Sequence, residues 1–459
     1  MTGVVGDTIA AISTPLGEGG LAIVRISGPQ ALAVAERCFL PVGRRSQKPT
    51  TAPSHTVHYG RVMLRNRLVD HVLHTVFRAP RSFTREDTVE ISCHGGPLPA
   101  KLVLDAALAA GARLAEPGEF TRRAFLNGRL DLTQAEAVAD LIHAKTDLAL
   151  AVANEQLAGR LSRRIDALRE ELVAVQAQIE AHIDFPDEDI VPETRDQLRH
   201  RIEQVIEGMQ TLLATAKEGQ VLRHGVRAAI VGRPNVGKSS LLNQLLGHDR
   251  AIVSPLPGTT RDTVSETANI GGVPVTLVDT AGLRETGDSI ESEGVRRSRS
   301  AAAVADLILH VLDASQPLAH EDALYLEEFA SRKRVLVCNK CDLPMQLQLP
   351  PPPDIPQATV SCLTGQGIEQ LKEAIKSAVW AHGASAAALE AMVNSRHEDA
   401  LRRAHRSAVD ALNGLQCGLG IELVAVDLRL AVDALGEVVG NTLTEDLLDA
   451  IFGQFCIGK

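Results

Sequence analysis

Short apolar runs and turn clusters alternate over the first 118 residues of the chain. Branched and apolar side chains fill residues 21–26 and 88–92, which indicates β-strands. The Gly-Gly-Pro cluster at 95–97 and the Glu-Pro-Gly cluster at 116–118 are typical of turns between such elements. We therefore predict one α+β domain over residues 1–118.

A helical period replaces this pattern from residue 133 onward. Apolar side chains recur at steps of three and four, as on one face of a helix, at Leu157, Leu161, Ile165, Leu168, Leu172, Val175 and Ile179. The stripe favours a helix packed on its own domain, and an intermolecular coiled coil is the alternative. Two prolines and an acidic loop end this helix after residue 184, and a further helix leads to about residue 216. Residues 119–219 are thus expected to form the first part of a helical domain.

Apolar strands alternate with helical segments over residues 220–379, which predicts right-handed βαβ units and a parallel sheet. The expected strands are residues 227–232, 275–279, 307–313, 335–339 and 358–362. The prolines at 350–353 indicate a surface insertion with extended backbone. The pattern is helical again over residues 380–459, so the predicted fold class is multidomain α/β, with the α/β section inserted into a discontinuous all-α domain.

Composition and charge limit the classes of function. Hydrophobic residues make up 45% and charged residues 23% of the 459 residues, as in a globular protein. Aromatic residues are only 3%, which supplies few stacking platforms for single-stranded nucleic acid. The formal net charge of −10 gives no chain-wide attraction to phosphates, so we expect any RNA contact to be local or assisted by a partner.

Nothing in the sequence predicts a secretory signal or a membrane span, because the best apolar run, 301–312, is broken by Asp306. Seven scattered cysteines do not suggest a disulfide framework, and a reducing cytoplasm is the expected location. The pair Cys338 and Cys341 has no second pair and lies inside a nucleotide-binding motif, which disfavours a metal role.

A phosphate-binding loop follows the strand predicted at 227–232. Residues 232–239 read Gly-Arg-Pro-Asn-Val-Gly-Lys-Ser and match the P-loop pattern at the start of a helix. Backbone N–H groups there would face the phosphates, Lys238 would reach the β/γ oxygens, and Ser239 would ligate Mg²⁺. The residues expected to bind GTP in this segment are Asn235, Val236, Gly237, Lys238, Ser239 and Ser240.

Three further motifs stand at or after strand ends. The carboxylate of Asp279, followed by Thr280, Ala281 and Gly282, is expected to reach the magnesium shell. Asn339, Lys340 and Asp342 select guanine, because the Asp342 carboxylate can accept two N–H donors that adenine does not offer. Backbone contacts alone are expected from Ser361, Cys362 and Leu363. The set predicts a Ras-like P-loop GTPase domain.

Catalysis in this domain requires another source of water positioning, because Leu283 follows Gly282 where Ras-like proteins carry glutamine. We hypothesise that K⁺ sits between Asn235 and the loop at 252–262 and supplies positive charge. The alternative is that Asn235 only stabilises the loop. Thr260 is the best candidate in that loop for a Mg²⁺ ligand, and Glu291 is a candidate to order water or simply a solvated acid.

Segments along essentially the whole chain carry a family resemblance. They are residues 7–11 (Asp-Thr-Ile-Ala-Ala), 25–28 (Arg-Ile-Ser-Gly), 82–87, 94–97 (His-Gly-Gly-Pro), 117–127, 258–262 (Gly-Thr-Thr-Arg-Asp) and 456–459 (Cys-Ile-Gly-Lys). With the P-loop section between them, these segments resemble the MnmE/TrmE family.

The resemblance implies site residues beyond the motifs. The implied K⁺ ligands are Asn235, Ser254, Leu256 and Thr259, with Pro255, Pro257, Gly258 and Thr260 also lining the GTP site. Glu291 becomes the favoured catalytic acid. The implied contacts to a tetrahydrofolate in the N-terminal domain are Arg25, Glu90, Arg129 and Lys459. Family members often carry Lys where Arg129 stands, and a forked guanidinium presents a different geometry.

The resemblance also implies partners and a reaction. The N-terminal domain would form a homodimer, and an FAD-containing partner, MnmG, would join the chain in a heterotetramer. Together they would place a carboxymethylaminomethyl or aminomethyl group on the wobble uridine of tRNA. The carbon would come from 5-formyl- or 5,10-methylene-tetrahydrofolate.

Cys456 is a candidate nucleophile toward uracil or a one-carbon unit, with an inert packed thiol as the alternative. The final residue, Lys459, is wrong for a prenylation signal.

Two other classes of protein compete with this interpretation. A ribosome-assembly GTPase of the Era or Der kind would append a basic RNA-binding domain, and the section after residue 379 is net acidic. A GTP-gated dimer without chemistry of its own would use the nucleotide only to drive rearrangement. No Gly-x-Gly-x-x-Gly occurs, so redox chemistry is expected from another subunit.

Overall fold

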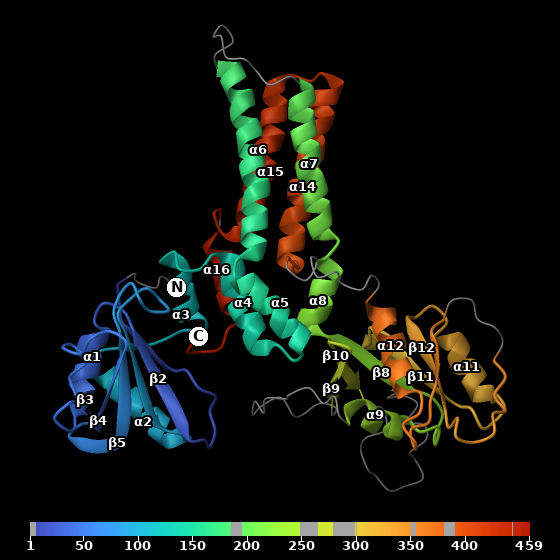
Figure 1. Ribbon diagram of the computed structural model, residues 1–459, viewed down its shortest axis with the longest axis horizontal. Coiled ribbons are helices and arrows are strands. Elements are labelled where there is room, and N and C mark those ends of the chain that lie inside the picture. Colours follow the sequence, from blue (N-terminus) through green and yellow to red (C-terminus); the bar gives the residue numbers. More distant parts are fainter. Residues whose placement is uncertain are drawn as a thin grey trace. The chain divides into compact units, whose positions relative to one another are not determined.

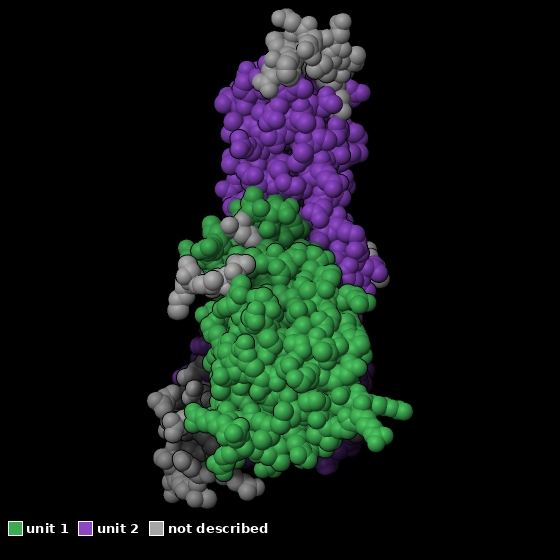
Figure 2. Space-filling model, turned by 90° about the vertical axis from the view of Figure 1, so that its left-hand side faces the viewer, with its two compact units in different colours: residues 1–139, 436–459 green, residues 140–435 purple. Residues whose placement is uncertain are grey.

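The computed structural model describes residues 6–184, 195–247, 265–278, 299, 301–349, 355–380, 391–442 and 444–459. The chain divides into two compact units, residues 1–139 with 436–459 and residues 140–435 (Figure 2). Within the described residues, no helix is both long enough and apolar enough to cross a membrane.

The first unit is built on a seven-stranded sheet with the order β3-β4-β5-β6-β2-β1-β7 (Figure 1). Its strands are β1 (Ile9–Ile12), β2 (Leu21–Ser27), β3 (Phe39–Pro41), β4 (Thr56–Leu64), β5 (Arg67–Phe77), β6 (Thr88–His94) and β7 (Arg113–Leu114). Alternation along the strands buries one face of the sheet, where α1 (Ala31–Cys38) and α2 (Pro97–Ala109) pack on Val24, Val72 and Ile91. The predicted α+β architecture is confirmed.

Chain segments far apart in sequence complete this unit. α3 (Glu119–Leu126) and α4 (Leu132–His143) share an apolar cluster with α16 (Glu445–Phe452), in which Phe125, Leu132 and Phe452 meet. The carboxyl end of the chain therefore belongs to the same compact unit as the first sheet.

Long helices form one part of the second unit (Figure 1). They are α5 (Asp147–Leu157), α6 (Arg160–Asp184), α7 (Arg195–Leu213), α8 (Ala216–His224), α14 (Ser395–Cys417) and α15 (Ile421–Val439). The apolar stripe expected as one helix is divided, because α5 ends at Leu157 and Gly159 adopts a φ of 76° before α6 begins. Its later members Leu161, Leu172 and Ile179 are at most 1% exposed, as expected of a helix packed within its own chain.

The α/β part of the second unit is a six-stranded sheet with the order β13-β12-β11-β8-β10-β9. The predicted parallel strands are present as β8 (Val226–Val231), β10 (Val273–Val278), β11 (Leu307–Asp313), β12 (Arg334–Asn339) and β13 (Gln357–Thr359). β9 (Ser265–Ile270), which the sequence did not predict, pairs antiparallel with β10 at the edge. Crossover helices α9 (Lys238–Leu246), α11 (His320–Glu328) and α12 (Ile368–Val379) complete the domain.

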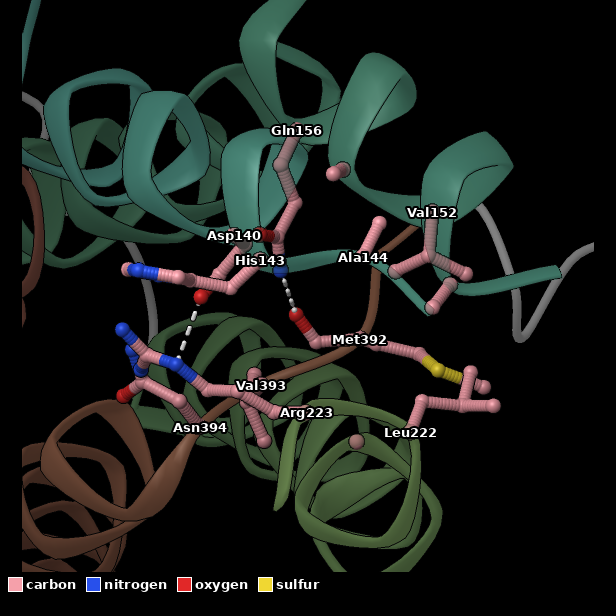
Figure 3. A pocket seen from close by; sticks show the side chains of 13 residues that line it. Asp140, His143, Ala144, Val152, Gln156, Leu222, Arg223, Met392, Val393 and Asn394 are labelled. Atoms are coloured by element: carbon pink, nitrogen blue, oxygen red, sulfur yellow. Dashed lines mark hydrogen bonds and ion pairs between the residues drawn. The ribbon is translucent and has the colours of Figure 1, made fainter. Parts of the chain in front are cut away.

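Helices α4, α5 and α8 and the segment before α14 line a small pocket of this unit (Figure 3). Arg223 at the end of α8 forms an ion pair of 2.6 Å with Asp140 on α4. Gln156 Nε2 donates to the carbonyl of Met392 at 2.7 Å. These contacts join α4 and α5 to the segment that leads into β8 and to the segment that leads into α14. α8 also spans residue 219, where we predicted the first helical section to end.

Candidate functional site

The phosphate-binding loop connects β8 to α9. Gly232 adopts a φ of 145°, and a Cβ there would lie 2.4 Å from the carbonyl oxygen of Val311. Asn235 is exposed and adopts a φ of 61°, a left-handed conformation that asparagine tolerates better than most residues. Gly237 is the N-cap of α9, so the first turn of that helix presents Lys238, Ser239 and Ser240. This layout offers backbone N–H groups to an anion.

Lys238 is held by its own loop. Its Nζ donates to the carbonyl of Gly232 at 2.8 Å and to that of Arg233 at 2.7 Å. The ammonium group therefore lies over the concave side of the loop, where a P-loop lysine is needed to reach phosphate oxygens.

Asn339 connects the phosphate loop with the loop predicted to contact the base. Its side chain is buried, its Nδ2 donates to the carbonyl of Val236 at 2.8 Å, and its Oδ1 accepts from the backbone N–H of Cys362 at 3.1 Å. A Cβ on Gly237 would lie only 2.2 Å from Asn339 Nδ2. The side chain of Asn339 thus holds the phosphate loop, the end of β12 and the loop of Cys362 in one arrangement.

Lys340 and Asp313 form an ion pair beside this arrangement. Lys340 Nζ lies 2.6 Å from Asp313 Oδ2, and the Asp313 side chain is only 3% exposed. Burial works to raise the pKa of Asp313, but hydrogen bonds from Lys340 and Ser315 outweigh it and hold that pKa below its usual value. The pair fixes Lys340, whose φ is 68°.

The candidate base-binding side chains differ in exposure. Asp342 is exposed at the end of the Asn-Lys-Cys-Asp motif, and Leu363 is 84% exposed. Ser361 is fully buried, and its Oγ accepts from the N–H of Thr364 at 3.2 Å. Burial, with the nearby Asp342 carboxylate, raises the pKa of the Cys362 thiol to about 11, so this cysteine offers backbone rather than thiolate chemistry.

Many predicted site residues lie outside the described residues. They are Ser254, Pro255, Leu256, Pro257, Gly258, Thr259, Thr260, Asp279, Thr280, Ala281, Gly282 and Glu291.

Three of the four predicted folate contacts come together in the first unit. Arg25 on β2 lies opposite Glu90 on β6, and their side chains pair at 2.8 Å. Arg25 Nη1 also donates to the carbonyl of Gly458 at 3.2 Å, which brings the segment of Lys459 to the same place. The Arg25 guanidinium stands over the Phe120 ring, 5.5 Å from its centre.

Arg129, the fourth predicted folate contact, lies beside Phe83, which packs on the apolar cluster of Ile9, Ala11, Ala115 and Phe120. Its Nη1 donates to the carbonyl of Ser82 at 3.0 Å, and its guanidinium stands 5.8 Å from the centre of the Phe83 ring. Phe83 packs on the cluster that contains Phe120, so Arg25 and Arg129 flank one group of aromatic rings.

Backbone contacts fix the position of Cys456. The Cys456 carbonyl accepts from the N–H of Gly118 at 3.3 Å, and Ile457 forms a β-bridge with Pro117. Gly458 adopts a φ of 96°, and a Cβ there would lie 2.3 Å from the carbonyl oxygen of Ile12. The thiol of Cys456 is exposed.

Two ion pairs next to the candidate nucleotide site were not predicted from the sequence, because each joins a motif residue to an aspartate that is distant in sequence and belongs to no motif. One is Lys340 with Asp313, and the other joins Arg233 of the phosphate loop to Asp322 on α11. From the sequence, Asp322 could have been identified only as an acid in the first turn of a helix.

Family models and full-length relatives indicate the same protein family. Residues 8–129 match the family model of the GTP-binding protein TrmE N-terminus, and residues 132–456 match that of the MnmE helical domain. A tRNA modification GTPase MnmE of Chloroflexus aurantiacus is 51% identical over 461 residues, covering 99% of this chain and 100% of the relative. That of Geobacillus kaustophilus is 48% identical and covers 99% of both chains. The G domain of the T. maritima FeoB iron transporter is 30% identical over 33% of this chain and 98% of its own, but the TM-score of 0.24 adds nothing to the fold.

Proposed function

The chain belongs to the MnmE/TrmE family of tRNA modification GTPases, and on this basis we propose a K⁺-dependent GTPase that acts with an FAD-containing partner, MnmG, on the wobble uridine of tRNA. GTP hydrolysis in tRNA modification is the activity of the family. The potassium, the partner and the folate carbon are our proposals. We place the protein in the cytoplasm, where its tRNA substrate is found.

The observation that carries the nucleotide site is the pair of hydrogen bonds made by Asn339, to Val236 and to Cys362. They fix the phosphate loop against the loop that follows β13, and the exposed Asp342 carboxylate lies near Cys362 of that second loop. Guanine would donate two N–H groups to Asp342, and Mg²⁺ would be held by Ser239 with Thr260 and Asp279. Equal turnover of ATP and GTP would contradict this proposal.

The proposed K⁺ ligand in the phosphate loop is Asn235, with Ser254, Leu256 and Thr259. Asn235 is exposed beside the loop and has a neutral carbonyl oxygen, the kind of ligand that a monovalent cation accepts. The test compares GTP turnover in KCl and NaCl for the native protein, Asn235→Gly and Asn243→Ala. Glycine keeps the left-handed conformation and removes only the ligand, while the exposed Asn243 on α9 is the matched control. Equal native rates in both salts would rule out the cation.

The proposed folate site rests on Arg25, Glu90, Arg129 and Lys459. Arg25 and Glu90 present a donor and an acceptor next to each other, which suits the edge of a pterin, and Lys459 suits an anionic glutamate tail. Calorimetric titration with 5-formyl-tetrahydrofolate should show weaker binding to Glu90→Gln than to the native protein. An unchanged affinity would remove Glu90 from the site.

The proposed homodimer uses the sheet face opposite α1 and α2. On this face Tyr59 lies opposite Leu73, and both side chains are more than 40% exposed, as is Val57. Exposed apolar residues on a sheet favour burial against a second copy. Light scattering should show that Leu73→Glu halves the native mass, while Leu430→Glu on α15 leaves it unchanged. A native protein that is already monomeric would refute the dimer.

The reaction itself needs reconstitution with MnmG, tRNA, GTP and a one-carbon folate, followed by mass spectrometry of the nucleosides. Modified wobble uridine supports the proposal, and its absence leaves only the GTPase. Because the Cys456 thiol is exposed and not packed, the remaining alternative is an inert surface thiol. Cys456→Ser separates a nucleophile from such a thiol, because serine keeps the size of the side chain but not its thiolate. Full modification by this variant would favour a GTP-gated switch without covalent chemistry.

A further inference from the structure

The phosphate loop is tied to α11 by an ion pair of low exposure. Arg233 Nε lies 2.8 Å from Asp322 Oδ2, and the two side chains are 18% and 2% exposed. Asp322 is the third residue of α11, and its Oδ2 also accepts from the N–H of Ala319, the N-cap, at 3.4 Å. The aspartate therefore connects the start of α11 to the second residue of the loop.

The same arginine fixes the P-loop lysine through its backbone. Lys238 Nζ donates to the carbonyls of Gly232 and Arg233, so the orientation of these peptide groups decides where the ammonium group lies. A side chain at position 232 is excluded, because a Cβ there would lie 2.4 Å from the carbonyl oxygen of Val311. The ion pair that restrains the Arg233 side chain therefore also restrains the Arg233 carbonyl to which Lys238 donates.

The surroundings of Asp322 show that burying this ion pair costs free energy of folding. Among the residues that the structure describes, Asp322 Oδ1 is buried without a hydrogen-bond partner. Burial raises the pKa of this carboxyl, and the charge of Arg233 opposes that rise. A buried ion pair of this kind is weak evidence of a gain in stability, because desolvation offsets the attraction.

We propose that Arg233 and Asp322 are positioning residues for nucleotide binding, which hold the peptide of Arg233 so that Lys238 and the loop N–H groups are arranged for the phosphates. The inference rests on the proposed function of the P-loop as the GTP site. Neither side chain is expected to touch the nucleotide.

Two single variants and their combination separate positioning from stability. Arg233→Met leaves the aspartate buried without its partner, and Asp322→Asn removes the charge but keeps an acceptor for the N-cap. Both singles should lower Tm, whereas the double variant, with neither charge, should recover most of it. The dissociation constant for fluorescent GDP should rise about tenfold in all three, the scale of one charge-assisted contact. KM for GTP should follow, with kcat changed less than about threefold.

Two further variants complete the experiment. Arg233→Lys keeps a cation within reach of Asp322 and should restore most of the GDP affinity. Glu328→Gln breaks the exposed pair with Arg299 at the other end of α11 and should leave binding unchanged. Recovery of GDP affinity together with Tm in the double variant overturns the proposal. So does native affinity in both singles, and in that case the nucleotide site itself stands, because the native protein still binds GDP.

Discussion

A buried histidine in the G-domain sheet should make the stability of this domain depend on pH. His310 on β11 is fully buried, and both of its ring nitrogens lack a hydrogen-bond partner among the described residues. Its ring stands edge-on to the ring of Tyr325, with 6.2 Å between the two ring centres. Burial first, and the charge of Arg334 second, lower its pKa from 6.5 to about 4.

The sign and size of the effect follow from these two pKa values. A lowered histidine pKa means that the unfolded chain binds the proton more readily, so the stabilisation is complete above pH 6.5 and is lost as the pH falls toward 4. Between pH 8 and pH 5 the loss is about 2 kcal/mol. His310→Leu removes this dependence, and because it also removes two unpaired buried nitrogens, it should not destabilise the domain at pH 8.

The single tryptophan gives a selective assay. Trp380 is 5% exposed and belongs to the apolar cluster that joins the G-domain sheet to Val152 and Leu222 of the helical part, so its fluorescence in urea follows the unfolding of this shared core. The free energy of unfolding is measured at pH 8 and pH 5 for the native protein, His310→Leu and the control His320→Gln, which changes an exposed histidine on α11. An equal loss of stability in the native protein and His310→Leu would refute the reasoning.

Two further predictions concern glycines that approach other backbone. Gly237→Ala should weaken GDP binding at least about tenfold, because its Cβ would displace the Asn339 amide and its φ of 99° disfavours any side chain. Titration with fluorescent GDP checks this prediction. The control is Gly365→Ala, which has a φ of 81° but no atom near the added Cβ. Gly458→Ala should weaken folate binding, because the Cβ would push the Gly458 carbonyl away from Arg25. Calorimetric titration with 5-formyl-tetrahydrofolate measures the affinity. Native affinity in this variant would show that the Gly458 carbonyl does not support the folate site.

The strand, loop and helix that carry the proposed nucleotide site were predictable from local sequence. A P-loop must follow a strand and begin a helix, and the segment from Gly232 to Ser239 stands between β8 and α9 as the pattern required. The apolar runs of the central strands were equally clear, since both faces of β11 and β12 are buried. The edge strand β9 was missed because its polar sequence, Ser-Glu-Thr-Ala-Asn-Ile, lacks that continuous apolar signal.

Contacts between distant residues could not be predicted in the same way. The stripe from Leu157 to Ile179 keeps its helical period across Gly159, and only the left-handed backbone of that glycine shows that two helices share it. Arg233 and Asp322 carry no mutual signal, since each looks like an ordinary surface charge in its own segment. Their pairing depends on how α11 packs, which is a property of the whole sheet.

The carboxyl terminus shows how much such a contact changes the interpretation of a residue. In the sequence Cys456 is a cysteine near the end of a helical section, and only Lys459 of its own segment connects it to the predicted folate residues. In the structure, Gly118 binds its carbonyl, and Arg25 binds the carbonyl of Gly458, two residues further on. The last four residues are therefore a part of the N-terminal sheet unit. The proposed folate site at Arg25 and the exposed Cys456 thiol therefore belong to the same compact unit, which is a precondition for covalent chemistry at Cys456.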